Sequence, residues 1–314
     1  MAGYIFGRIV GGLITLLCVS ALAFFATALA PGNPAAVLLG NMATPERVEA
    51  INKLMGLDQP LLVRYGVWLR EVLQGNLGNS NLSFRPVLGL IGAALPATLE
   101  LAALSLVVAV LISIPLGLLM AHKHNSWWMR PLSGFVTLGI SVPGFWVGLL
   151  LIVIFSVWLH LLPSGGFVPL TRNLGGNLRS LILPTLTLVI YLTPSLVRFV
   201  RVAAAAVLRE DYVDTARAKG AGIGRIMLRH VAPNTLISTI TYIGLQLGLL
   251  ISGTIIIEVI FAIPGIGRLG MSAVLNRDYP VIQGVVLVAA TGYVVVNLLV
   301  DLAYSLIDPR VRIQ

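Results

Sequence analysis

The sequence is poor in charged residues and has almost no cysteine. Asp, Glu, Lys and Arg make up 11% of its 314 residues, whereas hydrophobic residues make up 57% and the mean hydropathy is +0.95. Since soluble domains carry about 25% charged residues, this composition excludes an ordinary soluble domain and indicates an integral membrane protein. The single cysteine, Cys18, cannot form an intrachain disulfide, so any part outside the membrane must fold without one.

Motifs for phosphate and metal chemistry are also missing. The sequence has neither a Gly-x-x-x-x-Gly-Lys-Ser/Thr phosphate loop nor a His-Glu-x-x-His metal motif. If the protein works with ATP, the ATP must therefore be hydrolysed elsewhere. The basic residues behind the net charge of +9 are spread thinly, without interleaved aromatics, which disfavours nucleic acid as a partner. An intramembrane hydrolase could use His160 and Ser164, but these residues lie beside glycines at the end of an apolar run, and we interpret them as incidental.

What the sequence has instead is long apolar runs. They lack the period-two alternation of a transmembrane barrel, so they predict helices. The first run is about 21 residues long, compared with 7–15 for a signal-peptide core, so we expect a retained helix. The sequence therefore predicts an all-α membrane protein with six transmembrane helices, near 9–30, 96–121, 132–162, 180–200, 235–258 and 282–307.

The basic residues indicate how these helices are oriented. Cytoplasmic loops are enriched in Lys and Arg. With the amino terminus inside the cell, the short external loops hold four basic residues, namely Arg172, Arg179, Arg268 and Arg277. Twelve then lie on the cytoplasmic side: Arg8, Lys123, Arg130, Arg198, Arg201, Arg209, Arg217, Lys219, Arg225, Arg229, Arg310 and Arg312. Both termini are therefore predicted to be cytoplasmic.

The runs divide the chain into three parts: a first helix (1–30), an external segment (31–95) and a five-helix core (96–314) that includes a cytoplasmic loop at 201–233. In the external segment, Thr44-Pro45 predicts a helix start and Met55-Gly56 its end. A second helix is predicted from Gln59 to Gln74. The segment forms either a small helical cap with a function or a folded spacer.

Prolines predict bends in several spans, at Pro115, Pro143, Pro184 and Pro194. The third run has 31 residues and would extend about 46 Å as a straight helix, which exceeds a bilayer core of roughly 30 Å. We therefore expect a break near Ser141-Val142-Pro143-Gly144. Broken helices can line a pathway, which makes Ser141, Pro143, Phe145 and Trp146 candidate pathway residues, although structural helices are also kinked by proline.

Three carboxylates, Glu100, Glu258 and Asp301, fall in or near the predicted spans. Acids inside a membrane are candidate functional sites because burying charge there is costly. An ion-coupled secondary transporter could use them, but we find no inverted repeat typical of such carriers. All three lie within about two turns of a span end, so we favour structural or interface roles.

The cytoplasmic stretch 201–233 is too polar to cross a membrane. Asp211 and Asp214 lie near the start of a predicted helix, Arg217 and Lys219 lie near its end, and Gly220 permits a turn after it. A second short helix would place five residues on one face: Ile223, Ile226, Met227, His230 and Val231. Two short helices at an angle would form a knob suited to docking in another protein's groove; the alternative is an ordinary basic loop.

This stretch resembles the EAA loop of permeases of binding-protein-dependent ABC importers. The family pattern is Glu-Ala-Ala, three residues, Gly, nine residues, then Ile-x-Leu-Pro. The matching positions here are held by Asp214, Thr215, Ala216, Gly220 and Pro233. His230 and Ala232 stand where the pattern has isoleucine and leucine, whereas the spacing from Gly220 to Pro233 is kept.

Further segments resemble one branch of that family, the dipeptide, oligopeptide and nickel permeases. Asn33 and Asn76 stand where this branch usually has aspartate, so no carboxylate role is assigned there. Together, the order and spacing of the segments are specific: Ala30–Pro34, Met55–Pro60, Leu95–Leu101, Ser141–Trp146, Leu162–Gly166, Pro264–Arg268, Arg277–Pro280 and Asp308–Arg310.

The resemblance implies a permease of the type I ABC importer fold in a bacterial inner membrane, in contact with lipid. A second, related permease would pair with it, and two ATPase subunits, which hold ATP and Mg, would dock on the 201–233 loop. An external binding protein would deliver the substrate to the long loop and to the 259–281 hairpin, which carries Arg268, Arg277, Asp278 and Tyr279. Peptides are the leading substrate class, and glutathione, nickel chelates and other solutes remain open.

Overall fold

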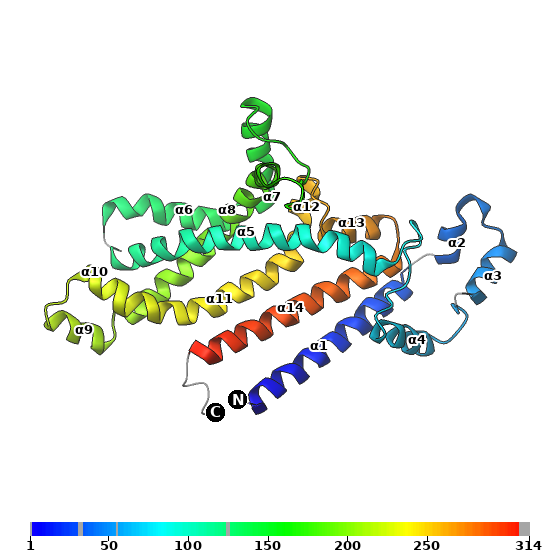
Figure 1. Ribbon diagram of the computed structural model, residues 1–314, viewed down its shortest axis with the longest axis horizontal. Coiled ribbons are helices and arrows are strands. Elements are labelled where there is room, and N and C mark those ends of the chain that lie inside the picture. Colours follow the sequence, from blue (N-terminus) through cyan, green and yellow to red (C-terminus); the bar gives the residue numbers. More distant parts are fainter. Residues whose placement is uncertain (1, 31–33, 55, 124–125, 308–314) are drawn as a thin grey trace. The chain divides into compact units, whose positions relative to one another are not determined.

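The computed structural model describes residues 2–30, 34–54, 56–123 and 126–307. Asn33 and the carboxy-terminal segment from Asp308, with Arg310 and Arg312, lie outside the described residues. The described part is helical, with one isolated β-bridge between Asn79 and Pro86. Its α-helices (Figure 1) are α1 Ala2–Ala28, α2 Pro34–Leu39, α3 Pro45–Leu54, α4 Leu61–Leu73, α5 Val87–His122, α6 Arg130–Ser141, α7 Gly144–Leu151, α8 Leu174–Val207, α9 Asp211–Ala218, α10 Ile223–Ile226, α11 Ala232–Gly253, α12 Ile255–Ile260, α13 Ile266–Leu275 and α14 Tyr279–Ile307.

Four described helices are long and apolar enough to cross a bilayer: α1 over Phe6–Ala28, α5, α8, and α14 over Tyr279–Leu302. A bent pair that contains α6 and α7 would make a fifth span. The sixth predicted span falls on α11 and α12, and the 22 residues of α11 extend about 33 Å, roughly the thickness of a bilayer core. The predicted all-α membrane fold is confirmed.

The break in the third run is confirmed. Trp127–Ser141 and Gly144–Trp158 meet at 105°. Proline disfavours helical geometry in the residue before it, and Val142 accordingly has extended backbone angles, φ −85° and ψ 128°. Pro184 and Pro194, in contrast, lie inside α8 without dividing it.

The helix α5 begins at Val87, nine residues before the start of the apolar run near 96. The predicted boundary of the external segment at 95 therefore falls inside a helix. Pro96 lies within α5 and removes one backbone hydrogen bond. Buried contacts stabilise these first turns, because Val87, Ile91 and Ala94 form an apolar cluster with residues of α13 and with Val281.

The chain forms two compact units. One contains Leu99–Ile263 with the described residues from Val295 on, and the other contains the described residues of Ala2–Thr98 with Pro264–Val294. In the first unit α8 is the central helix: it packs against α6, α7 and α11, and 72% of its most apolar stretch is buried. The second unit includes the two helices predicted in the external segment, found as α3 and α4. At the start of α3, Thr44 Oγ1 accepts a hydrogen bond from Arg47 N at 3.4 Å.

The close approach of α5 to α8 gives a test of this packing. A Cβ on Gly117 would lie 2.6 Å from the Val200 side chain, whereas a Cβ on Gly134 in α6 would meet nothing within 4 Å. Alanine favours a helix over glycine by about 1 kcal/mol, but overpacking costs about 1–3 kcal/mol. We expect Gly117→Ala to lower the thermal unfolding temperature of the purified protein and Gly134→Ala to leave it unchanged or raise it. Equal behaviour of the two variants would contradict the packing of α5 against α8.

Candidate functional site

The residues of the cytoplasmic stretch form a defined structure. α9 begins after Glu210, with Asp211 and Asp214 in its first turn, where the helix dipole favours negative charge. Arg217 Nη1 lies 2.9 Å from Asp214 Oδ1 in an exposed ion pair, which contributes little to stability because water screens it. The side chains of Asp211, Asp214 and Arg217 are all exposed on this face of α9.

Gly220 ends α9 in a conformation that other residues rarely adopt. Its φ is +79°, the left-handed region in which glycine has no steric penalty. Gly220 N donates to Arg217 O at 2.9 Å and Ala221 N to Ala216 O at 3.1 Å, which satisfies the last carbonyls of the helix. The turn reverses the chain and leads into α10.

The second helix differs from the expectation of a separate short piece. α10 continues through a π-helical turn at Met227–Val231 directly into α11. Pro233, at the start of α11, has no N–H to donate to the preceding turn, and the wider π-helical spacing ends just before it. The second arm of the predicted knob is thus the first part of a long helix.

A small apolar core holds the two arms together. The buried residues Val213 of α9 and Ile226 of α10 pack with Val231, with Ala121 of α5 and with Ala204 of α8. Ala216 and Met227 pack against this core and are half-buried. We call this group the coupling core.

The opposite side of the same segment is exposed on the surface of the unit. The exposed residues of the predicted set are Asp211, Asp214, Thr215, Arg217, Lys219, Gly220, Ile223 and Pro233. The half-buried His230 has its ring 6.4 Å from that of Tyr212. Partial burial, and to a smaller extent the charge of Glu210, raises the pKa of the Tyr212 phenol above its ordinary value. The exposed surface from Asp211 to Ile223 is the docking face in the rest of the article.

A cavity of about 490 Å³ lies within the unit built around α8. Its polar lining groups come from Thr187, Tyr191, Ser195, Tyr242 and Gln246. Gln246 Nε2 donates to Ser195 Oγ at 3.2 Å, and Ser195 Oγ donates to Leu192 O at 2.9 Å. No charged side chain is among the lining residues of this cavity.

The predicted pathway residues are only partly brought together there. Phe145 lines the cavity, whereas Ser141 lines a separate one of about 330 Å³ with Arg198 and Arg201. Pro143 and Trp146 line neither. The sequence analysis missed Gln246 and Ser195, although an amide in the middle of an apolar run is a signal that could have found Gln246.

The four residues assigned to the external hairpin differ in exposure. Arg268 and Arg277 are exposed, whereas Asp278 and Tyr279 are 3% and 9% exposed. Asp278 Oδ2 accepts a hydrogen bond from Ser80 Oγ at 2.5 Å, and Oδ1 accepts one from Asn81 N at 3.0 Å. Asp278 therefore ties the Asn79–Asn81 turn to the start of α14, and its burial removes it from a direct contact with a binding protein. The Tyr279 side chain is likewise too buried to contact a binding protein directly.

The membrane carboxylates are not gathered into a site. Glu258 is fully buried, and its Oε1 accepts a hydrogen bond from Thr254 Oγ1 at 2.9 Å. Glu100 and Asp301 are half-buried, and none of the three lines the cavity beside Gln246. Among the described residues no group of three His, Cys, Asp or Glu side chains could hold a metal ion.

Comparison with known proteins identifies the family. The model described as "Binding-protein-dependent transport system inner membrane component" matches residues 113–313, and the model of the amino-terminal part of such membrane components matches residues 1–102. The chain belongs to this family. A putative peptide transport system permease of Brucella abortus is 39% identical over 99% of both chains. A probable peptide ABC transporter permease of Sinorhizobium fredii is 38% identical over 99% of this chain and 100% of the relative. A glutathione transport system permease of Salmonella typhi is 38% identical over 99% of both.

The protein is thus a permease subunit of an ABC importer, a multi-pass component of the inner membrane. Transport systems of this family depend on a binding protein, and ABC importers on ATPase subunits. The phosphate-loop motif that holds ATP in many ATPases does not occur in this sequence.

The buried carboxylate of Asp278 offers a second test. Removing it leaves the Ser80 hydroxyl and the Asn81 amide without their acceptors, and a hydrogen bond to a charged group contributes about 1.5–3 kcal/mol. We expect Asp278→Ala to lower the thermal unfolding temperature of the purified permease clearly, whereas Asp58→Ala, at an exposed position, should not. An unchanged unfolding temperature for Asp278→Ala would show that this link is not structural.

Proposed function

We propose that this permease forms half of a translocation pathway for peptides or similar small solutes, and that a second homologous permease forms the other half. Two ATPase subunits would bind the docking face from the cytoplasm, where both termini would also lie, and an external binding protein would deliver the substrate. The names of the peptide and glutathione permeases that resemble the chain over its full length support the substrate class. The structure of the 211–233 segment supports the coupling role.

The observation that carries the coupling role is the coupling core. Val213 is fully buried in a cluster with residues of α5, α8, α10 and the π-helical turn that leads into α11. Movement of α9 would therefore displace the ends of these helices. Well-packed interiors transmit displacement because they contain little free volume. A rigid-body movement of the ATPases at the exposed side of α9 would therefore reach the helices that line the 490 Å³ cavity, two of which are α8 and α11. The docking face and the cavity would then be coupled sites, because a change at one would alter the free energy of the other.

The turn at Gly220 tests this coupling. A β-branched residue is strained at a φ of +79°, by about 1–3 kcal/mol, so Gly220→Val should alter the angle between the two arms. We expect it to reduce both ATP-driven uptake and co-purification of the ATPase subunits several-fold. The matched control is Gly224→Val in α10. Gly224 is exposed and has no positive φ, and a Cβ added there would have no other atom within 4 Å. Unchanged uptake together with unchanged ATPase association in Gly220→Val would refute the docking role.

The cavity beside Gln246 supports a pathway for polar, peptide-like solutes. Its hydroxyl groups and one amide can replace hydrogen bonds that a peptide backbone makes to water, and its Leu, Ile, Phe and Tyr side chains can contact apolar substituents. The absence of a lining carboxylate disfavours the alternative, an ion-coupled secondary transporter that binds its ion at Glu100, Glu258 or Asp301.

Among the polar groups of the cavity, we expect the Gln246 amide to affect the rate at which a peptide passes through it. Replacing it with leucine removes the donor to Ser195 Oγ and one hydrogen-bonding amide, and a net hydrogen bond contributes about 1 kcal/mol, or roughly fivefold in a rate or affinity. Gln246→Leu should reduce peptide uptake by about this factor while the ATPase subunits still co-purify. Thr241→Leu, at an exposed position of α11 outside the cavity, is the control. If both variants transport like the original protein, Gln246 does not line the pathway.

A further inference from the structure

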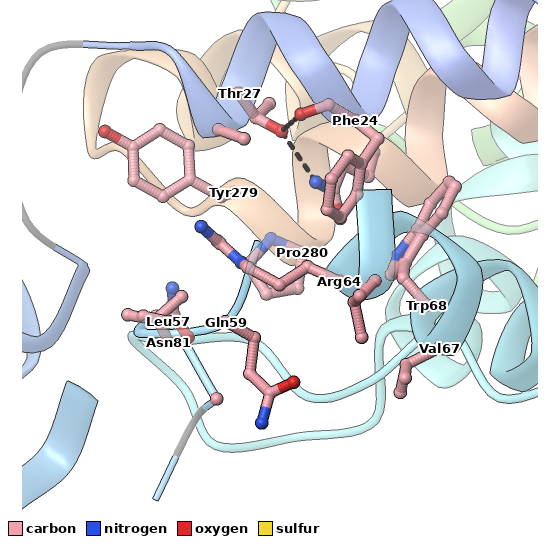
Figure 2. A pocket seen from close by; sticks show the side chains of 14 residues that line it. Phe24, Thr27, Leu57, Gln59, Arg64, Val67, Trp68, Asn81, Tyr279 and Pro280 are labelled. Carbon is pink, nitrogen blue, oxygen red and sulfur yellow. Dashed lines mark hydrogen bonds between the residues drawn. The ribbon is translucent and has the colours of Figure 1, made fainter. Parts of the chain in front are cut away.

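A second sizeable cavity lies in the unit that contains α1, and the family relationship assigns it no role. It has a volume of about 650 Å³, within the range of small-molecule sites. Its wall is formed by the end of α1, the first half of α4, the turn before α4, Asn81 and the start of α14. Figure 2 shows Phe24 and Trp68 at one side of it and Tyr279 at the other.

Arg64 is the one charged side chain among the 14 lining residues. It is half-buried, and its guanidinium has no hydrogen-bond or ion-pair partner within the described part of the chain. In Figure 2 its side chain extends across the cavity toward the ring of Tyr279. A partly buried charge without a partner is unfavourable, and a guanidinium binds phosphate or carboxylate oxygens in pairs, so the cavity selects an anion.

The position of the cavity on α1 narrows the class of anion. Phe24, Thr27 and Ala28 belong to the last turns of the apolar span Phe6–Ala28, so the cavity opens where that span reaches the membrane surface. Only 17% of the most apolar part of this span is buried within the protein. Its exposed leucines, Leu13, Leu17 and Leu22 among them, therefore offer contact to acyl chains.

Aromatic residues at the cavity, Phe24 and Trp68, and next to it, Phe25 and Tyr65, are typical of a membrane interface. Phe24, Phe25, Tyr65 and Trp68 form a cluster in which Phe24 and Trp68 have ring centroids 5.4 Å apart. Trp and Tyr are enriched at the level of lipid headgroups because one end of the ring system is apolar and the other polar. The Gln283 amide, which donates to Thr27 Oγ1 at 2.6 Å, fixes the junction of α1 with α14 at the wall of the cavity.

We propose that this cavity binds the headgroup of an anionic phospholipid, with its phosphate on Arg64 and its acyl chains along α1. A net negative headgroup such as phosphatidylglycerol is favoured over a zwitterionic one, because no acidic side chain lines the cavity to receive an ammonium group. The neutral amides of Gln59 and Asn81 can hydrogen-bond glycerol hydroxyls. The bound lipid would hold α4 against α1, so that membrane composition would affect the external segment.

The test uses the assembled importer in neutral detergent and native mass spectrometry. The probes are short-chain phosphatidylglycerol, short-chain phosphatidylcholine, glycerol phosphate and glutathione. We expect phosphatidylglycerol to bind tightest and Arg64→Gln to weaken it about tenfold or more, as expected when a charge-assisted hydrogen bond is lost. Arg70→Gln is the matched control because Arg70 is an exposed arginine of α4 outside the cavity. Trp68→Leu should weaken binding too.

Several outcomes would overturn the proposal. Equal binding of phosphatidylglycerol by Arg64→Gln and Arg70→Gln would mean that Arg64 does not hold the phosphate. If glycerol phosphate bound as tightly as the lipid, the site would serve a soluble phosphate, and displacement of the lipid by glutathione would make it a substrate site. Should Arg64→Gln prevent assembly, failure of Trp68→Leu to change phosphatidylglycerol binding would equally refute a lipid site in this cavity.

Discussion

The constraint on which the rest of the structure depends is the absence of water from the bilayer core, which obliges every backbone N–H and C=O to find a partner in the protein. Helices meet this requirement along their length, and departures from regular helix occur where other groups can compensate. The break between α6 and α7 interrupts the helical hydrogen bonds at Val142 and Pro143. Two of these backbone groups still have partners, because Val142 N donates to Leu138 O at 3.1 Å and Trp146 N donates to Pro143 O at 3.1 Å. The long continuous α8 accommodates two prolines because neighbouring helices bury it.

A related constraint acts on polar side chains that are buried within the protein, because they too have lost water and need hydrogen-bond partners. Glu258 and Asp278 are both buried, and both carboxylates accept hydrogen bonds from residues at the ends of helices or in turns. Asp278 is supported by a turn about 200 positions earlier in the chain, so it stabilises a contact that the apolar clusters alone would not specify. Buried polar groups whose hydrogen bonds are satisfied specify which segments pack together, because apolar surfaces can pack against one another in more than one arrangement.

Much of the structure could be predicted from the sequence, because the signals involved are local. The break at Pro143, the start of α3 at Pro45 and the turn at Gly220 each follow from the backbone preferences of one or two residues. The start of α5 at Val87 could not be predicted in this way, because it depends on burial against residues almost 200 positions away, Ile266 and Val281. For the same reason Asp278 was assigned to the surface: its partners Ser80 and Asn81 are remote in sequence, and a local pattern shows only a charged residue in a short loop. The continuity of α10 with α11 was missed because a glycine-rich, basic stretch before a proline is typical of a helix boundary.

The distribution of charge over the first unit agrees with the transport pathway and the docking surface that we propose. A group that binds a passing solute must hold it strongly enough to replace water and weakly enough to release it, and a buried charge would fail the second condition because its interactions are strong where water is excluded. The cavity beside Gln246 has hydroxyl and amide groups instead. The docking face carries the opposite composition, with acids and bases exposed on α9 over the fully buried Val213. Charge on a docking surface would guide a partner into register, and the apolar core beneath α9 would transmit the movement that we propose.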